Sequence, residues 1–260
     1  MSFAETVVLA AFAGGTIFLG LPIGRVRGLS TSARAALTTA AAGVVLFLIY
    51  DVLSQAVEPV NTALQAARSG GPATDFAVYA ATLGGSVAFG LLSVTYLTQR
   101  MNGRAKKSAL TPQQVALGTA TGLGLHNFSE GLAIGQSAAA GATTLALILV
   151  IGFALHNATE GFAIGAPLGT GDRPSWGFLG LAGVVGGGPT FAGSLAGYVL
   201  VSPLLSILFL GLAAGALIFV FNEMMAAARR FSMPMVTGIA LTAGLLVAFG
   251  TDFVLSAAGA

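Results

Sequence analysis

Long stretches with very few charges limit what this chain can fold into. We place eight of them, at about residues 3–23, 32–57, 76–98, 111–139, 144–167, 176–200, 204–228 and 234–255. A helix needs about 20 apolar residues to cross the hydrocarbon core of a membrane, and each stretch meets that length. Charged residues make up 8% of the chain, against roughly a quarter in a soluble domain. The sequence therefore predicts an all-α membrane protein with eight transmembrane helices, in a single polytopic transmembrane domain over residues 1–260.

The basic residues predict how these helices are oriented. Those in or beside alternate connections are Arg25, Arg27, Arg34, Arg100, Arg104, Lys106, Lys107, Arg173, Arg229 and Arg230. Only Arg68 lies on the other side. Because positive residues gather in cytoplasmic connections, we expect both termini outside, in a multi-pass protein of the cell (inner or plasma) membrane. The pI of about 9.3 then reports topology, and no nucleic-acid partner is expected.

Two further observations limit the alternatives. The first stretch carries Glu5 and no preceding basic segment, so we expect no cleaved signal peptide. The chain has no cysteine, which excludes disulfides and thiolate metal ligands.

A pair of near-repeats stands inside the fourth and fifth stretches. Residues 126–131 read HNFSEG and residues 156–161 read HNATEG, and they contain the only two histidines. Four residues turn a helix through about 400°, which places each histidine about 40° from the glutamate that follows it. The short turn at Gly141 makes the two helices antiparallel neighbours, so the blocks can meet near the membrane midplane.

Polar residues at that depth are costly and usually functional. Imidazole with carboxylate suits zinc, iron, cobalt or manganese, and zinc takes about four such ligands. We therefore predict a metal site formed by His126, Glu130, His156 and Glu160. The alternative is that each histidine merely pairs with a glutamate to satisfy buried polar groups.

The neighbouring positions leave two readings open. Asn127 and Asn157 either face a second metal site or form interhelical hydrogen bonds. Gly131 and Gly161 are expected to allow close helix contact.

Other acids are candidates for a metal pathway. Asp51 lies in the outer half of the second stretch and Glu223 near the inner end of the seventh. They are predicted entrance and exit ligands, the alternatives being a local hydrogen bond for Asp51 and an ion pair with Arg229 or Arg230 for Glu223. The remaining acids near the outer ends are expected to be solvated, namely Glu5, Glu58, Asp75 and Asp252.

The paired blocks on successive central helices resemble those of the ZIP (Zrt/Irt-like) metal transporters, and in particular the bacterial GufA-like or ZupT-like branch. The resemblance covers most of the chain. It implies movement of divalent metal, zinc above all, toward the cytoplasm, with iron, manganese, cobalt and cadmium as other cargo. It implies that His126, Glu130, His156 and Glu160 form the primary site, that Asn127 and Asn157 face a second one, and that Glu160 or Glu130 bridges the two.

Three features depart from the pattern of that family. Ser129 and Thr159 stand where a proline often precedes the motif glutamate, and their hydroxyls can bend a helix more mildly. Gly188-Pro189 stands where a Glu-Pro pair often supplies the second site, which favours a single metal site here. The connection at 100–107 has no histidine, unlike the histidine-rich loop of many members.

Two prolines point to a weak internal symmetry. Pro22 in the first stretch and Gly188-Pro189 in the sixth, which we expect to be broken there, fit an inverted repeat of helices 1–3 and 6–8.

No nucleophile or nucleotide motif is present, so we expect no enzyme and no required cofactor beyond the bound or transported metal, for which we expect Zn²⁺. The alternative is an integral-membrane metal-dependent hydrolase that uses the same cluster. Expected partners are divalent metal ions, the lipid bilayer and a second copy in a homodimer.

Overall fold

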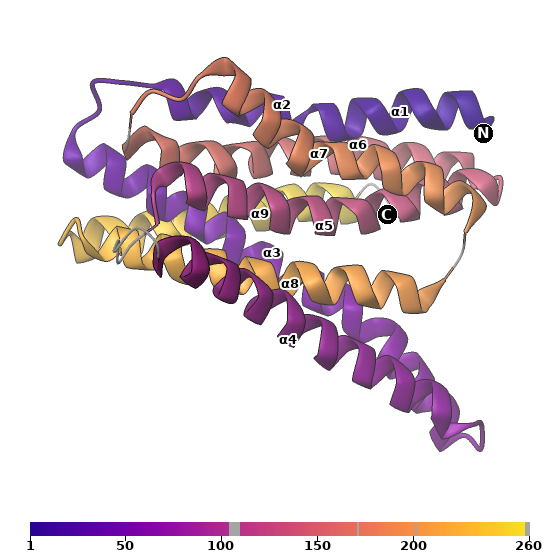
Figure 1. Cartoon of the computed structure of the whole chain (residues 1–260). Coiled ribbons are helices and arrows are strands. Elements are labelled where there is room, and N and C mark those ends of the chain that lie inside the picture. The colour runs from indigo at the N-terminus through magenta and orange to yellow at the C-terminus, as the bar shows by residue number, and fades with distance from the viewer. Residues whose placement is uncertain (104–109, 171, 201, 258–260) are drawn as a thin grey trace.

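The computed structural model describes residues 1–103, 110–170, 172–200 and 202–257, and its secondary structure is helical (Figure 1). In chain order the elements are α1 (Phe3–Gly15), α2 (Ile17–Gly20), η1 (Leu21–Arg25), α3 (Thr31–Arg68), α4 (Ala73–Gly103), α5 (Pro112–Ala139), α6 (Thr143–Gly165), η2 (Ala166–Thr170), α7 (Trp176–Val199), α8 (Pro203–Arg229) and α9 (Pro234–Ala257). Within those ranges there is no β-strand. The all-α prediction is confirmed.

The helices have the length and composition of membrane spans. Seven segments among the described residues are long and apolar enough to cross a bilayer, at Phe3–Arg25, Thr31–Arg68, Ala73–Tyr96, Ala146–Gly169, Trp176–Val199, Pro203–Arg229 and Pro234–Val254. Helix α5 is long enough, with 28 residues, but is not among these seven. It carries the polar block that begins at His126, together with three glutamines. The chain is thus a membrane-type helical protein, in which α5 as an eighth span stays a prediction.

Two predicted helix limits are wrong. Helix α3 does not stop before Pro59 but continues through it to Arg68. Helix α7 is one continuous helix, and Pro189 lies inside it after the run of three glycines. A proline removes one backbone hydrogen bond, and a long helix with packed neighbours can absorb that loss. The first span does change at its proline, since Pro22 lies in the 3₁₀ segment η1.

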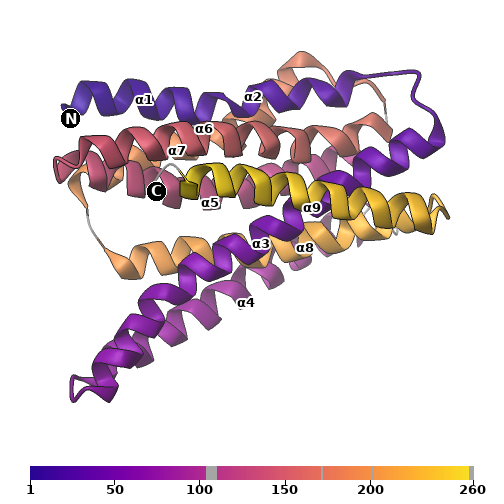
Figure 2. The same cartoon turned by 180° about the vertical axis from the view of Figure 1, so that it is seen from behind.

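The helices pack in two groups. Helices α1, α2, α5, α6 and α7 contact one another in the first group, and α3, α4, α8 and α9 do so in the second. The groups meet where α5 packs on α8 and where α6 packs on α3 and α9. Phe47, Leu123 and Leu217 are fully buried in the core cluster at this junction. The α3–α4 hairpin projects beyond the other helices (Figures 1 and 2).

The packing pairs agree with the predicted symmetry. Helix α3 packs on α9 and α4 packs on α8. In an inverted repeat of spans 1–3 and 6–8, α3 corresponds to α8 and α4 corresponds to α9. The α3–α9 pair is then equivalent to the α8–α4 pair. This is the pairing that an inverted repeat requires, and the repeat itself stays a prediction.

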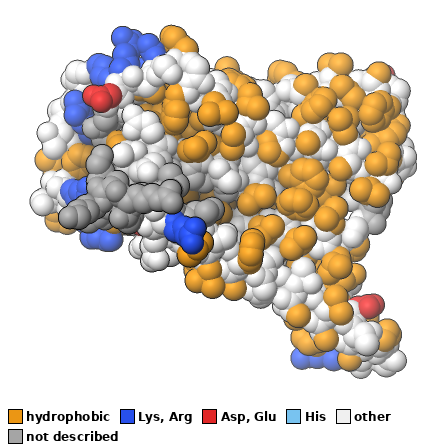
Figure 3. All heavy atoms as spheres, in the orientation of Figure 1, with side chains coloured by type: hydrophobic (Ala, Val, Ile, Leu, Met, Phe, Trp, Pro, Cys, Tyr) orange, Lys and Arg blue, Asp and Glu red, His pale blue; other side chains and the backbone are white. Residues whose placement is uncertain are grey.

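Positive charge gathers at one end of the molecule (Figure 3). That end holds the connection after η1, the α6–α7 connection and the α8–α9 connection, whereas Arg68 lies at the far tip of the α3–α4 hairpin (Figure 1). Arg25 binds across this end, because it donates a hydrogen bond to the Pro174 carbonyl and lies 4.3 Å from the ring centre of Trp176. Arg104, Lys106 and Lys107 lie outside the described residues. Which side of a membrane this end faces stays a prediction.

Candidate metal site

The two motif blocks lie on neighbouring antiparallel helices. Helix α5 carries His126 and helix α6 carries His156, and the two helices are joined by a turn in which Gly141 has a φ of +76°. That backbone conformation is easy for glycine and costly for other residues, which explains why a glycine closes the turn. The centres of the two imidazole rings lie 5.9 Å apart. The blocks therefore do meet, as their spacing predicts.

The structure brings the four predicted ligands together. Nε2 of His126 lies 3.2 Å from Oε1 of Glu130 and 4.0 Å from Oε1 of Glu160. Nε2 of His156 lies 3.7 Å from the same Glu160 oxygen. All four residues are buried, at 0–5% exposure. Ligand atoms bound tetrahedrally at zinc distances would be about 3.4 Å apart, so these three separations are close to those within a metal site.

Asp51 belongs to the same cluster. Its Oδ2 lies 4.0 Å from Nε2 of His126, and Asp51, His126 and His156 each offer a ligand atom within 4.8 Å of the others. Gln55, one turn further along α3, donates a 2.9 Å hydrogen bond to the same Asp51 oxygen. The Asp51 side chain is 19% exposed, more than the side chains of His126, Glu130, His156 and Glu160. Asp51 thus stands beside the histidines on the more open side of the cluster.

Several buried polar atoms of this cluster have no hydrogen-bond partner among the described residues. They are both ring nitrogens of His126, Nε2 of His156, Oε2 of Glu130 and Oε1 of Glu160. Buried polar atoms in folded proteins are nearly always paired, and an unpaired one costs about 1–3 kcal/mol. Imidazole nitrogens and carboxylate oxygens are the kinds of atom that divalent cations bind in proteins, and each imidazole can offer one nitrogen to an ion. A bound cation would satisfy several of them at once.

The two asparagines form interhelical hydrogen bonds. Nδ2 of Asn127 donates to Oε2 of Glu160 at 2.7 Å and to the Gly186 carbonyl of α7 at 3.0 Å. Nδ2 of Asn157 donates to the Ala13 carbonyl of α1 at 3.0 Å. Asn127 therefore holds a predicted metal ligand in place. A direct metal role for Asn127 and Asn157 stays a prediction.

The motif glycines allow close helix approach, as expected. A Cβ atom on Gly131 would collide with the Thr190 carbonyl of α7, and one on Gly161 with the Ile17 carbonyl of α2. These contacts press α5 against α7 and α6 against α2, which fixes the direction in which each block faces. The hydroxyl of Thr159 donates to the His156 carbonyl at 2.7 Å, as proposed for a mild bend, whereas Ser129 Oγ has no such partner among the described residues.

The remaining acids fall into two sets. Glu5, Glu58 and Asp75 are exposed, as predicted. Asp252 of α9 is partly exposed and lies within electrostatic range of Asp51 and His156, so it is less fully solvated than the other three. Its position inside the last apolar stretch was the signal that could have revealed this.

Glu223 lies half-buried on α8. In the part of the chain that the structure describes, it forms no ion pair with Arg229 or Arg230. Its role as an exit ligand stays a prediction.

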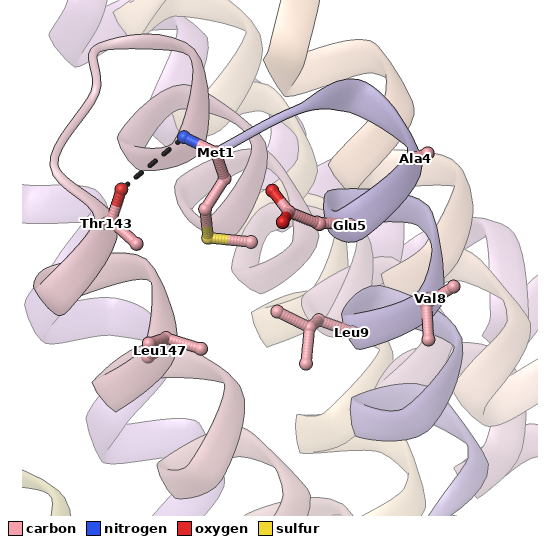
Figure 4. Close-up of a pocket in the computed structure, with 7 residues that line it drawn as sticks. All are labelled: Met1, Ala4, Glu5, Val8, Leu9, Thr143 and Leu147. Atoms are coloured by element: carbon pink, nitrogen blue, oxygen red, sulfur yellow. Dashed lines mark hydrogen bonds between the residues drawn. The ribbon is translucent and has the colours of Figure 1, made fainter.

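A cleft of about 600 Å³ lies elsewhere, between the starts of α1 and α6 (Figure 4). Glu5 is the only acid in its lining, and its carboxylate already accepts hydrogen bonds from the backbone and hydroxyl of Ser2. No imidazole lines this cleft in the described residues. It therefore lacks the donor set of the cluster at His126.

A comparison of the chain with sequence models of known protein families finds no match, and neither does a comparison with curated proteins.

Proposed function

We propose that this chain is a divalent metal transporter of the ZIP type, that zinc is its main cargo, and that it moves the ion toward the cytoplasm. The observation that carries the proposal is the group of unpaired buried nitrogen and oxygen atoms around His126 and His156, inside a membrane-type helical protein. Buried ionisable groups between transmembrane helices usually mark an ion pathway.

The residues suggest how the cation would be taken up. The partly exposed Asp51, held by Gln55, would bind the hydrated ion first. The ion would then exchange water for the imidazoles of His126 and His156, which are neutral donors. The carboxylates of Glu130 and Glu160 would offset its charge, so that the occupied site is far less costly to bury than the ion alone.

The site would hold one ion rather than two. Helix α7 presents Gly186–Pro189 opposite Asn127, with no carboxylate there. One oxygen of Glu160 is already held by Asn127, which leaves the other for metal. Release would follow along α8 past Glu223, toward the end of the molecule where the basic residues gather.

Uptake into proteoliposomes tests this function. Zinc, manganese, iron and cadmium would be supplied to vesicles holding the wild type, His156→Ala or Glu130→Ala, and Glu58→Ala serves as control because Glu58 is exposed on α3. We expect zinc uptake by the wild type and the control and little by the two site variants. Equal uptake by all four proteins would refute the site. Absence of flux together with hydrolase activity that a chelator abolishes would favour the enzyme instead.

A further inference from the structure

A pocket with two polar residues in an otherwise apolar lining lies at the end of the molecule where the basic residues gather. Its volume is about 340 Å³, and its lining includes Thr38 of α3, Pro112 of α5, Pro167 of η2, Met224 of α8, and Arg230, which directly follows α8. The lining thus comes from both helix groups. No acid or imidazole lines it in the described part of the chain, so it is not a second metal site.

Thr38 is the first indication of a ligand. It is 2% exposed, it lines the pocket, and its hydroxyl has no hydrogen-bond partner among the described residues. A threonine in a helix usually bonds back to a carbonyl of the preceding turn. The adjacent Thr39 does so, because its hydroxyl donates to the Ala35 carbonyl at 2.7 Å. The free hydroxyl of Thr38 is therefore available to a molecule in the pocket.

One arginine of the lining supplies positive charge, and a second lies one helical turn from Thr38. Arg230 lines the pocket and, within the described ranges, forms no ion pair. Arg34 lies one turn from Thr38 on α3, and its Nε is buried without a partner in the described chain. The nearest acid along α8 is Glu223, about two turns from Arg230.

The N-terminus of α5 adds to this field. Thr111 caps the helix and Pro112 occupies its first turn. The positive end of the helix dipole of a 28-residue helix therefore lies beside the pocket.

The rest of the lining is apolar, including Met224, Leu110 and Phe231. A ligand that matches both the positively charged and the apolar side of the pocket has an anionic group with several acceptor oxygens next to a hydrocarbon portion. Basic pockets between membrane helices bind such head groups. We propose that this pocket binds the phosphate group of an anionic phospholipid, held by Arg230 and the Thr38 hydroxyl, with its glycerol end against the apolar residues.

Binding can be measured on the purified full chain in neutral detergent. The probes are short-chain phosphatidylglycerol, short-chain phosphatidylcholine and inorganic phosphate, each titrated while thermal unfolding is followed, since a ligand that binds only the folded state raises Tm. The variants are Arg230→Gln and Thr38→Val. Their matched controls are Arg229→Gln and Thr39→Val, whose parent residues are adjacent but do not line the pocket.

We expect phosphatidylglycerol to bind at least about tenfold more tightly than phosphatidylcholine. Arg230→Gln and Thr38→Val should each weaken phosphatidylglycerol binding by a similar factor, because each removes one charge-assisted or buried hydrogen bond. The control variants should bind like the wild type. If inorganic phosphate binds as tightly, the site takes a free anion and the lipid assignment is wrong. Equal binding of both lipids, or equal loss in variants and controls, would overturn the site altogether. If a variant has a lower Tm than the wild type without ligand, its lipid binding is compared with that of the wild type by native mass spectrometry, which reads the lipid-bound fraction of the folded protein.

Discussion

Nε2 of His126 lies 4.0 Å from Oδ2 of Asp51, although the two residues belong to different helix groups. His126 and its partner His156 come from α5 and α6, whereas Asp51 comes from α3. The proposed metal site therefore spans the junction of the two groups. A ligand contributed from across that junction makes the site sensitive to how the groups sit against each other.

Asp51→Asn tests that ligand. The amide keeps the shape and loses the charge, so zinc affinity should fall by at least about tenfold, as for the loss of a group at a metal centre. Isothermal titration in detergent measures it. Glu58→Gln, on the exposed part of the same helix, should bind zinc like the wild type. An unchanged affinity for Asp51→Asn would remove Asp51 from the site.

Asn127 and Asn157 form a matched pair for separating metal binding from stability. Both donate buried interhelical hydrogen bonds, but only Asn127 bonds a proposed ligand, Glu160. Each alanine variant should lose about 1–3 kcal/mol of stability, since buried partners are left unsatisfied. Only Asn127→Ala should also weaken zinc binding. Thermal unfolding with and without zinc gives both quantities, and equal zinc affinity in the two variants would contradict the positioning role.

The close packing of α5 against α7 can be tested by replacing each of two glycines of α5 with alanine. Gly131→Ala should destabilise the protein by about 1–3 kcal/mol, because its Cβ would collide with the Thr190 backbone. Gly118→Ala should be neutral or stabilising by up to about 1 kcal/mol, since a Cβ there meets only Val220 Cγ2 at 3.6 Å and alanine favours the helix. Thermal unfolding of both variants checks this. Equal effects would argue against the close packing.

Zinc affinity should depend on pH. Metal binds deprotonated imidazole and carboxylate, so protons compete with it, and a free imidazole takes up a proton at about pH 6.5. With two histidines as ligands, affinity should fall steeply as the pH is lowered from about 7.5 to 5.5. Titrations across this range measure the slope. In His156→Ala the slope should be shallower, and an affinity that does not change with pH would exclude imidazole ligands.

The helical architecture could be predicted because hydrophobic length is a local property. Each stretch of low charge is helical close to its expected place, and the first is divided into α1, α2 and η1. The limits at Pro59 and Pro189 were wrong because tertiary packing decides whether a proline ends a helix, and its sequence neighbours do not show that packing.

The site was predictable in part for the same reason. His126 with Glu130, and His156 with Glu160, are related by one helical turn, and the Gly141 turn pairs the two helices. The closeness of Asp51 to His126 could not be placed, because it depends on the rotation of α3 about its own axis. The interhelical bonds of Asn127 and Asn157 also depend on which carbonyls of α7 and α1 come near.

The most direct test is a zinc-loaded crystal structure with anomalous diffraction measured at the zinc edge. The account predicts one strong peak per chain, about 2.0–2.1 Å from the Nε2 atoms of His126 and His156. Carboxylate oxygens from Glu130, Glu160 or Asp51 should complete the coordination. A zinc peak elsewhere, or none between these two histidines at saturating zinc, would contradict the account.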